Sequence, residues 1–162
     1  MNKEYRAIHI IAIILDLVLI LTIAFALSSK ACAYSPEFET NAQNFVAKYR
    51  PTFLPYYGYF LEVCEEYGFT EYEVASLTGI MKMETMFGKT GHGRQYNYGG
   101  MRGKKGFYAY KNEFDGVNAI TLNWKHLYSG KGDLYWQLNK WVAPVSKKYL
   151  DDVKRTIRLL TK

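Results

Sequence analysis

Residues 7–27 form an almost unbroken aliphatic run of 21 residues near the N-terminus. About 20 apolar residues are enough to cross the roughly 30 Å hydrocarbon layer of a membrane. Lys3 and Arg6 precede the run, so the positive-inside rule places the N-terminus in the cytoplasm and the rest of the chain outside it. Ala31-Cys32-Ala33 then offers the small residues that a signal peptidase requires. We therefore expect residues 1–33 to be a membrane anchor or a cleaved signal peptide, and we favour the anchor.

The chain beyond residue 33 has about 130 residues, the size of one domain with one core. A chain with 49% hydrophobic and 22% charged residues is globular, which excludes a disordered or collagen-like protein. Tyrosine is unusually frequent, with 15 residues, and its ring and hydroxyl suit a polar, ring-shaped ligand. The net charge of +6 favours an anionic partner, which includes nucleic acid, an acidic membrane face and an anionic wall polymer.

The first half of this domain is predicted to hold a tether and two helices. Residues 34–50 are polar and mixed, and we expect a tether that ends in a short helix. Pro55 suits the first turn of a helix that runs to about residue 67. Thr70 and Glu73 have the Thr-x-x-Glu spacing of a capping box, which predicts a second helix that Gly88 closes.

The segment from residue 88 to residue 112 is rich in glycine, tyrosine and basic residues. Its sequence Gly-Lys-Lys-Gly at 103–106 lies between two aromatic runs and predicts the turn of a small hairpin. Asn112 is suited to cap a third helix, and apolar spacing predicts a fourth helix up to residue 144 and a fifth over 149–160. The expected fold class is α+β and mainly helical, with about five helices and a small β-hairpin lobe after an N-terminal transmembrane helix.

Glu84 continues the apolar stripe of the second predicted helix. Val74, Leu77 and Met81 lie at i, i+3 and i+7, and Glu84 takes i+10. A carboxyl on the inner face of a helix end is partly desolvated, which raises its pKa and lets it stay protonated near neutral pH. Such a group can act as a general acid towards a glycosidic oxygen. The alternative is that Glu84 only caps the exposed helix end and that the lobe is a long loop.

Four short motifs carry a resemblance to a known family. Glu84-Thr85-Met86-Phe87-Gly88 resembles the Glu-Ser-x-Phe/Gly-x motif of the lysozyme-like superfamily. Residues 96–102 resemble the segment that follows it in bacterial glucosaminidases and peptidoglycan lytic transglycosylases, and residues 107–115 and 141–153 are similar to later motifs of these enzymes. The resemblance covers residues 53–160. It implies that residues 51–162 form a lysozyme-like catalytic domain, of the lytic transglycosylase or the mannosyl-glycoprotein endo-beta-N-acetylglucosaminidase type.

This resemblance implies a substrate and a set of site residues. The substrate would be peptidoglycan, whose N-acetylglucosamine and N-acetylmuramic acid units are joined by β-1,4 bonds. Glu84 would be the catalytic acid, and Tyr110 would orient either Glu84 or the acetamido group of the substrate. No cofactor is expected, and the histidines lie in no metal-binding pattern. The residues expected to bind substrate are Tyr96, Asn97, Tyr98, Gly99, Gly100, Met101, Arg102 and Tyr108.

The sequence holds no Asp or Glu between Glu84 and Glu113. A two-carboxylate glycosidase needs a second acid about 5–9.5 Å from the first, whereas Glu113 and Asp115 suit a helix first turn, where the dipole favours negative charge. The prediction is a single-carboxylate mechanism in which the acetamido group of the substrate stabilises the anomeric carbon. Attack by the sugar's own 6-hydroxyl would make the protein a lytic transglycosylase, and attack by water would make it a hydrolytic N-acetylglucosaminidase.

Two classes of function are open at this point. The first is a membrane-anchored enzyme, with its catalytic domain on the periplasmic or wall side, that opens the wall locally for phage entry or for a secretion or conjugation apparatus. The second is a non-catalytic wall-binding protein that keeps the shape as a spacer. The expected partners are peptidoglycan strands and, through residues 7–27, the inner membrane or a virion membrane. Nucleic acid is not an expected partner.

Overall fold

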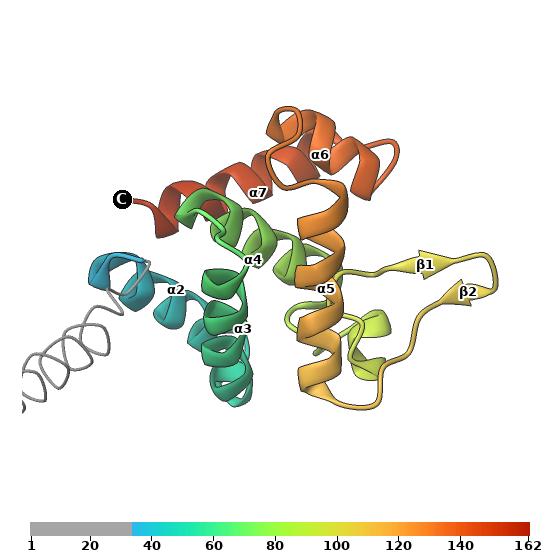
Figure 1. The fold of residues 1–162 in the computed structure, drawn as a ribbon, viewed down its shortest axis with the longest axis horizontal. Helices are drawn as coiled ribbons and strands as arrows, with labels where there is room; N and C mark the ends of the chain where they lie inside the picture. The colour runs from blue at the N-terminus through green and yellow to red at the C-terminus, as the bar shows by residue number, and fades with distance from the viewer. Residues whose placement is uncertain (1–33) are drawn as a thin grey trace, which may run out of the picture. The chain divides into compact units, whose positions relative to one another are not determined.

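Six α-helices and one hairpin make up residues 34–162, the part of the chain that the computed structural model describes (Figure 1). The helices are α2 (Pro36–Tyr49), α3 (Leu54–Glu66), α4 (Glu71–Thr85), α5 (Glu113–Leu127), α6 (Leu134–Trp141) and α7 (Lys147–Leu160). The remaining elements are strands β1 (Arg102–Gly103) and β2 (Gly106–Phe107) and the short 3₁₀ helices η1 (Pro51–Phe53) and η2 (Gly91–Gln95). The predicted α+β, mainly helical fold class is confirmed. The predicted membrane segment, residues 7–27, lies outside the described residues. Among residues 34–162, no helix is long and apolar enough to cross a membrane.

Local capping signals place two helix starts where the sequence predicts them. The Thr70 side chain accepts a hydrogen bond from the Glu73 backbone N–H, and the Glu73 carboxylate accepts one of 3.0 Å from the Thr70 N–H. The Asn112 side-chain oxygen accepts a 2.9 Å hydrogen bond from the Asp115 N–H at the start of α5. These bonds pair backbone donors that a helix otherwise leaves free at its N-terminus.

The predicted hairpin is confirmed. Arg102 pairs with Phe107 and Gly103 with Gly106 in antiparallel register, so residues 104 and 105 form the turn. The hairpin extends away from the helical body (Figure 1). Its turn carries two exposed lysines, which places positive charge at the tip.

Helix α2 corrects the expectation of a tether over residues 34–50. Ser35 caps its first turn, and Pro36 takes the first helical position, where a missing N–H costs nothing. Phe38, Ala42 and Val46 are fully buried, because a spacing of four residues puts them on one face of the helix. Helix α2 packs on α3 and α7. Helix α2 is therefore part of the same compact unit, residues 34–162, as the helices that follow it.

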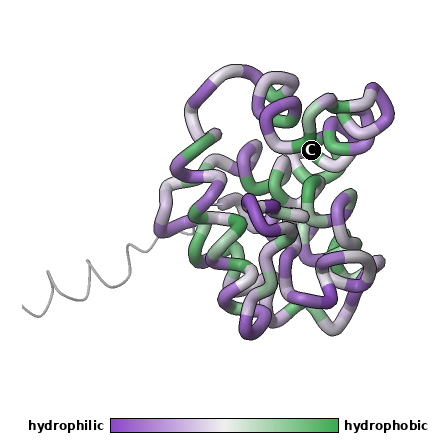
Figure 2. The backbone as a smooth tube through the Cα atoms, turned by 90° about the vertical axis from the view of Figure 1, so that its right-hand side faces the viewer, coloured by the Kyte–Doolittle hydropathy of each residue, from purple (hydrophilic) through white to green (hydrophobic). Residues whose placement is uncertain are grey.

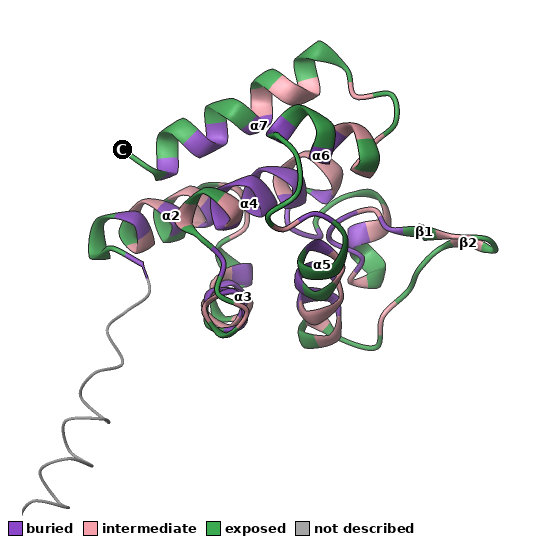
Figure 3. Ribbon diagram, turned by 45° about the horizontal axis from the view of Figure 1, so that its top comes forward, coloured by how far each residue is buried: buried purple, intermediate pink, exposed green. Residues whose placement is uncertain are grey.

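Helix α4 runs through the centre of the core. Every residue from Val74 to Met81 is buried. Hydrophilic and hydrophobic segments alternate along the backbone (Figure 2), and the helices α3, α5 and α7 carry both buried and exposed residues (Figure 3). Helix α7 lies close along α4 at Gly79, where an added Cβ would be 3.2 Å from Val153 Cγ1. The missing side chain at Gly79 therefore allows the close approach of two helices that meet again at the candidate site.

Candidate active site

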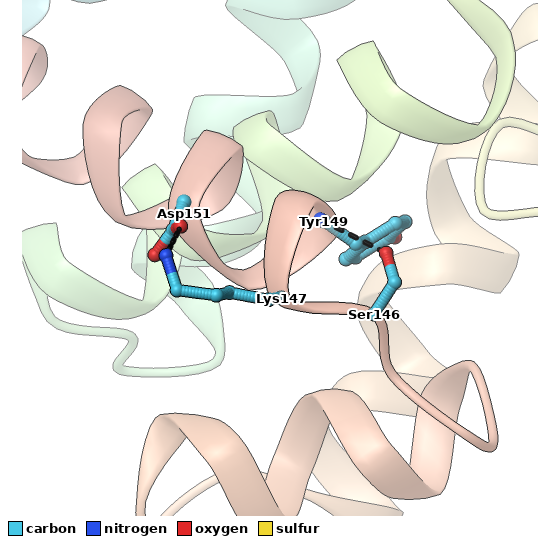
Figure 4. A network of polar contacts seen from close by, with 4 residues as sticks. All are labelled: Ser146, Lys147, Tyr149 and Asp151. Carbon is cyan, nitrogen blue, oxygen red and sulfur yellow. Dashed lines mark hydrogen bonds and ion pairs between the residues drawn. The ribbon is translucent and has the colours of Figure 1, made fainter.

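Glu84 lies near the C-terminal end of α4 and is paired with Tyr149 of α7. The Tyr149 hydroxyl donates a 2.8 Å hydrogen bond to Glu84 Oε1. The pairing follows from the Gly79–Val153 contact, because Tyr149 lies one turn before Val153 and Glu84 lies just over one turn beyond Gly79 on an antiparallel neighbour. Ser146 caps the N-terminus of α7, and its Oγ accepts a 3.2 Å hydrogen bond from the Tyr149 backbone N–H (Figure 4). This cap fixes the backbone of the residue that holds Glu84.

The second carboxyl oxygen of Glu84 faces the backbone of Gly100. An added Cβ at Gly100 would lie 2.7 Å from Glu84 Oε2, so a side chain there would collide with the carboxyl. Gly100 also has a φ of +61°, in the left-handed region that glycine adopts readily. One oxygen of Glu84 is thus held by Tyr149, and the other lies beside the loop that follows residue 96.

Burial raises the pKa of the Glu84 carboxyl above its usual value, and the hydrogen bond from Tyr149 partly counteracts this. Burial disfavours the charged form of a carboxyl, whereas a donated hydrogen bond favours it. Burial, followed by the neighbouring Glu84, also raises the pKa of Tyr149 well above its ordinary value, so Tyr149 stays protonated and donates to Glu84. The Glu84 side chain is only partly buried. A carboxyl in this setting can hold a proton and release it to a bound group.

Helix α4 ends at Thr85, three residues before the predicted end at Gly88. Residues 86–88 all have positive φ, which costs about 1–2 kcal/mol for each of the two that are not glycine. The Thr85 hydroxyl donates to the Tyr98 carbonyl at 3.1 Å and accepts a 3.0 Å hydrogen bond from the Gly88 N–H. The residue next to Glu84 thereby ties the end of the helix to the following loop.

Asn97 and Tyr98, which are predicted to bind substrate, instead hold this loop in place. The buried Asn97 amide donates to the Met101 carbonyl at 2.8 Å and to the Tyr108 carbonyl at 3.0 Å, and its Oδ1 accepts a 2.8 Å bond from the Met101 N–H. The Tyr98 ring is fully buried against Phe53, with ring centroids 4.8 Å apart. Both side chains are buried and make their contacts inside the fold, which assigns them a structural role in shaping the loop.

A cleft of about 330 Å³ opens beside the loop. One wall is the partly buried Trp141, whose indole N–H donates a 2.9 Å hydrogen bond to the Gly99 carbonyl. The lining also includes Lys140, Asn123 and Tyr128. Tyr96 and Glu84 are not part of the lining. The Glu84 carboxyl lies next to Gly100, which does line the cleft. Five of the predicted substrate-binding residues line this cleft: Gly99, Gly100, Met101, Arg102 and Tyr108.

A second groove of about 390 Å³ continues from the cleft, because both are lined by Met101 and Tyr108. Tyr110 lines this second groove, with its ring centroid 6.4 Å from that of Tyr108. The hydrogen bond to the Glu84 carboxyl comes from Tyr149, so the alternative that Tyr110 orients the acetamido group of the substrate stays a prediction. The structure therefore places Tyr110 in the groove that extends the cleft, and Tyr149 at the carboxyl.

The next two acidic residues along the chain after Glu84 lie at a helix N-terminus, where negative charge is favoured. Glu113 and Asp115 lie in the first turn of α5, as predicted. Within residues 34–162, no group of three or more His, Cys, Asp or Glu side chains is arranged to hold a metal ion.

Two residues of this site are absent from the predicted set. Tyr149 and Trp141 appear in the sequence as apolar positions of helices and as parts of the quoted motifs. Their contacts with Glu84 and Gly99 span 65 and 42 residues. Spacing within a single helix carries no information on such distant partners.

No protein-family model, curated protein or solved structure matches the chain. The resemblance of its motifs to the lysozyme-like superfamily therefore stays a prediction.

Proposed function

We propose that residues 34–162 form a lysozyme-like glycosidase that cuts the β-1,4 bonds of peptidoglycan, with Glu84 as its single catalytic carboxyl. The setting of Glu84 carries this proposal. Burial raises its pKa, Tyr149 holds one oxygen, and the other oxygen adjoins the backbone of Gly100, which lines a cleft. A protonated carboxyl beside a cleft is what a general acid requires.

In the first step, protonated Glu84 gives its proton from Oε2 to the glycosidic oxygen, and the bond from that oxygen to the anomeric carbon breaks. The oxygen of the 2-acetamido group of the substrate bonds to the anomeric carbon and stabilises its positive charge. Tyr149 assists because its hydroxyl stays bonded to Oε1 and a hydrogen bond to a carboxylate is stronger than one to a neutral carboxyl.

In the second step, the 6-hydroxyl of the same sugar attacks the anomeric carbon, displaces the acetamido oxygen and gives its proton to Glu84. The product carries a 1,6-anhydro ring, and Glu84 is protonated again. The groups that shift the pKa of Glu84 are its buried surroundings and the Tyr149 hydroxyl, and they do not include a second carboxylate. Because inverting and retaining hydrolases depend on such a second group, we favour a lytic transglycosylase over a hydrolase.

The cleft and the adjoining groove supply the surface for a glycan strand. The rings of Trp141 and Tyr108 offer faces on which sugar rings can stack. Arg102 and Lys140, both exposed on the cleft wall, would attract the lactyl and peptide carboxylates of the strand. In this proposal Tyr110 contacts the strand further along the groove.

The proposal also includes a location. Residues 7–27 anchor the chain in a membrane, and the catalytic domain lies outside the cytoplasm, where it opens the wall locally. No cofactor takes part.

Mass spectrometry of the fragments released from purified walls tests the proposal. We expect fragments that are lighter by one water than their hydrolytic counterparts and that end in 1,6-anhydromuramic acid. New reducing ends would instead make the protein a hydrolase and leave Glu84 in its role. No release above that of heat-inactivated protein would contradict the proposed activity.

A further inference from the structure

A separate pocket, whose lining shares no residue with the cleft or the groove, is lined by residues of α2, α4 and α7. It has a volume of about 150 Å³ and receives one cation from each helix, namely Lys48, Lys82 and Arg155. Helix α7 packs on both α2 and α4, and all three helices contribute to the lining of the pocket. Residues that are 34 or more positions apart in the sequence are thus brought to one small opening.

The positive charge of this pocket is not matched within the domain. Asp152 lines the same pocket, which leaves three positive charges against one negative charge. The ion pair found among residues 34–162 joins Lys147 to Asp151, so none of the three pocket cations has a carboxylate within ion-pair distance in this part of the chain. Positive charges placed close together repel each other, and a bound anion would offset this repulsion.

Helix dipoles account for only part of this arrangement. Lys48 and Lys82 lie in the last turns of α2 and α4, where a positive charge is favoured. Arg155 lies in the interior of α7, where the dipole gives no such benefit. A bound anion would explain why Arg155 faces the same opening as the two lysines.

The rest of the lining is aromatic and apolar. Phe45, Tyr49 and Leu159 contribute to the wall, Leu159 is 43% exposed, and Lys82 Nζ lies 5.6 Å above the Tyr49 ring. A free inorganic anion has no apolar part that could contact this surface. An anionic group carried on an apolar molecule matches both parts of the lining.

We propose that this pocket binds the phosphate group of an anionic phospholipid and so holds the domain against the membrane surface. Eight residues, 28–35, separate the predicted membrane segment from α2, and they span at most about 29 Å when fully extended. A domain on so short a connection stays near lipid headgroups. Lysine and arginine side chains bind phosphate through charge-assisted hydrogen bonds, and basic groups are attracted to anionic lipid surfaces. This inference rests on the predicted anchor and not on the glycosidase activity.

The test uses NMR of the full chain in neutral maltoside micelles, observed at the Arg155 side-chain Nε–H and the Tyr49 backbone amide. Phosphatidylglycerol added to the micelles should shift both signals in a saturable manner, whereas phosphatidylcholine should not. Soluble glycerol phosphate forms a third arm and should bind at least about tenfold more weakly than the lipid. Equal responses to the two lipids, a response to the soluble phosphate alone, or no response would each overturn the proposal.

Charge-reversal variants test the named residues. The double variant Lys48→Glu with Arg155→Glu changes two exposed positions. It should raise the phosphatidylglycerol concentration at which the Tyr49 amide shift is half-complete by at least about tenfold. The matched control, Lys148→Glu with Lys162→Glu, makes the same change in charge at exposed positions outside the pocket and should stay within about twofold. Equal weakening in both would mean that total charge, and not this pocket, governs binding. The neutral pair Lys48→Gln with Arg155→Gln replaces the reversal if the latter does not fold.

Discussion

Gly100→Ala places a methyl group between the candidate acid and the cleft. The new Cβ would lie 2.7 Å from Glu84 Oε2, so the carboxyl must retreat by roughly 0.7 Å to reach the ordinary contact distance of 3.4 Å. Tyr149 holds the other oxygen at 2.8 Å and opposes a simple shift of the carboxyl. The substitution therefore alters the position of the acid without changing its chemistry.

We expect Gly100→Ala to lower both the free energy of unfolding and the catalytic rate. A non-glycine residue at a φ of +61° costs about 1–2 kcal/mol of unfolding free energy. Misplacing a catalytic group by about 1 Å costs up to about 100-fold in rate, so we expect kcat on purified walls to fall by about 10- to 100-fold.

Gly68→Ala separates these two effects. Gly68 has a φ of +69°, and an added Cβ there meets nothing within 4 Å. Urea unfolding should show similar losses of stability for the two variants, while wall clearing should fall only for Gly100→Ala. Equal clearing rates for the two variants would refute the claim that contact with Gly100 positions Glu84.

Three further substitutions probe the site and its supports. Tyr149→Phe removes a hydrogen bond that lowers the pKa of Glu84, so the alkaline limb of the pH–rate profile should move to higher pH while the maximal rate falls; an unmoved limb would show that the bond does not act on the titrating acid. Asn97→Ala loses three hydrogen bonds, two of them buried, and should cost about 2–4 kcal/mol in urea unfolding, and a loss below about 1 kcal/mol would contradict its structural role. Glu113→Gln and Asp115→Asn should each cost only about 0.3–1 kcal/mol through the dipole of α5 and leave wall clearing unchanged; a loss of activity at either would indicate a second catalytic carboxylate.

Local signals in the sequence predict most of the helices and the hairpin. The Thr70–Glu73 box, the Asn112 cap and the turn at residues 103–106 depend on neighbours within four residues, so their chemistry can be recognised without a fold. Helix α2 carries comparable signals in Ser35, Pro36 and the apolar spacing that begins at Phe38. The polar composition of the segment favours a tether, whereas these local signals favour a helix, and the burial of one face of α2 shows that the local signals decide.

The site is predictable only where it follows from a single helix. Glu84 can be found because it extends an apolar stripe of α4. Its partner Tyr149 depends on how α7 crosses α4, which the close approach at Gly79 determines. Asn97 is a polar residue in a glycine-rich loop, and its sequence context does not distinguish a substrate contact from a buried amide that bonds its own loop.

The rate of wall clearing by Glu84→Gln tests the central claim most directly. The amide keeps the size of the carboxyl and can still accept the Tyr149 hydrogen bond, but it has no acidic proton to give. A general acid contributes about 10²–10⁴-fold, so clearing should fall by at least about 100-fold while the urea unfolding curve shows an intact fold. Retention of more than about a tenth of the wild-type rate would contradict the assignment of Glu84 as the catalytic acid.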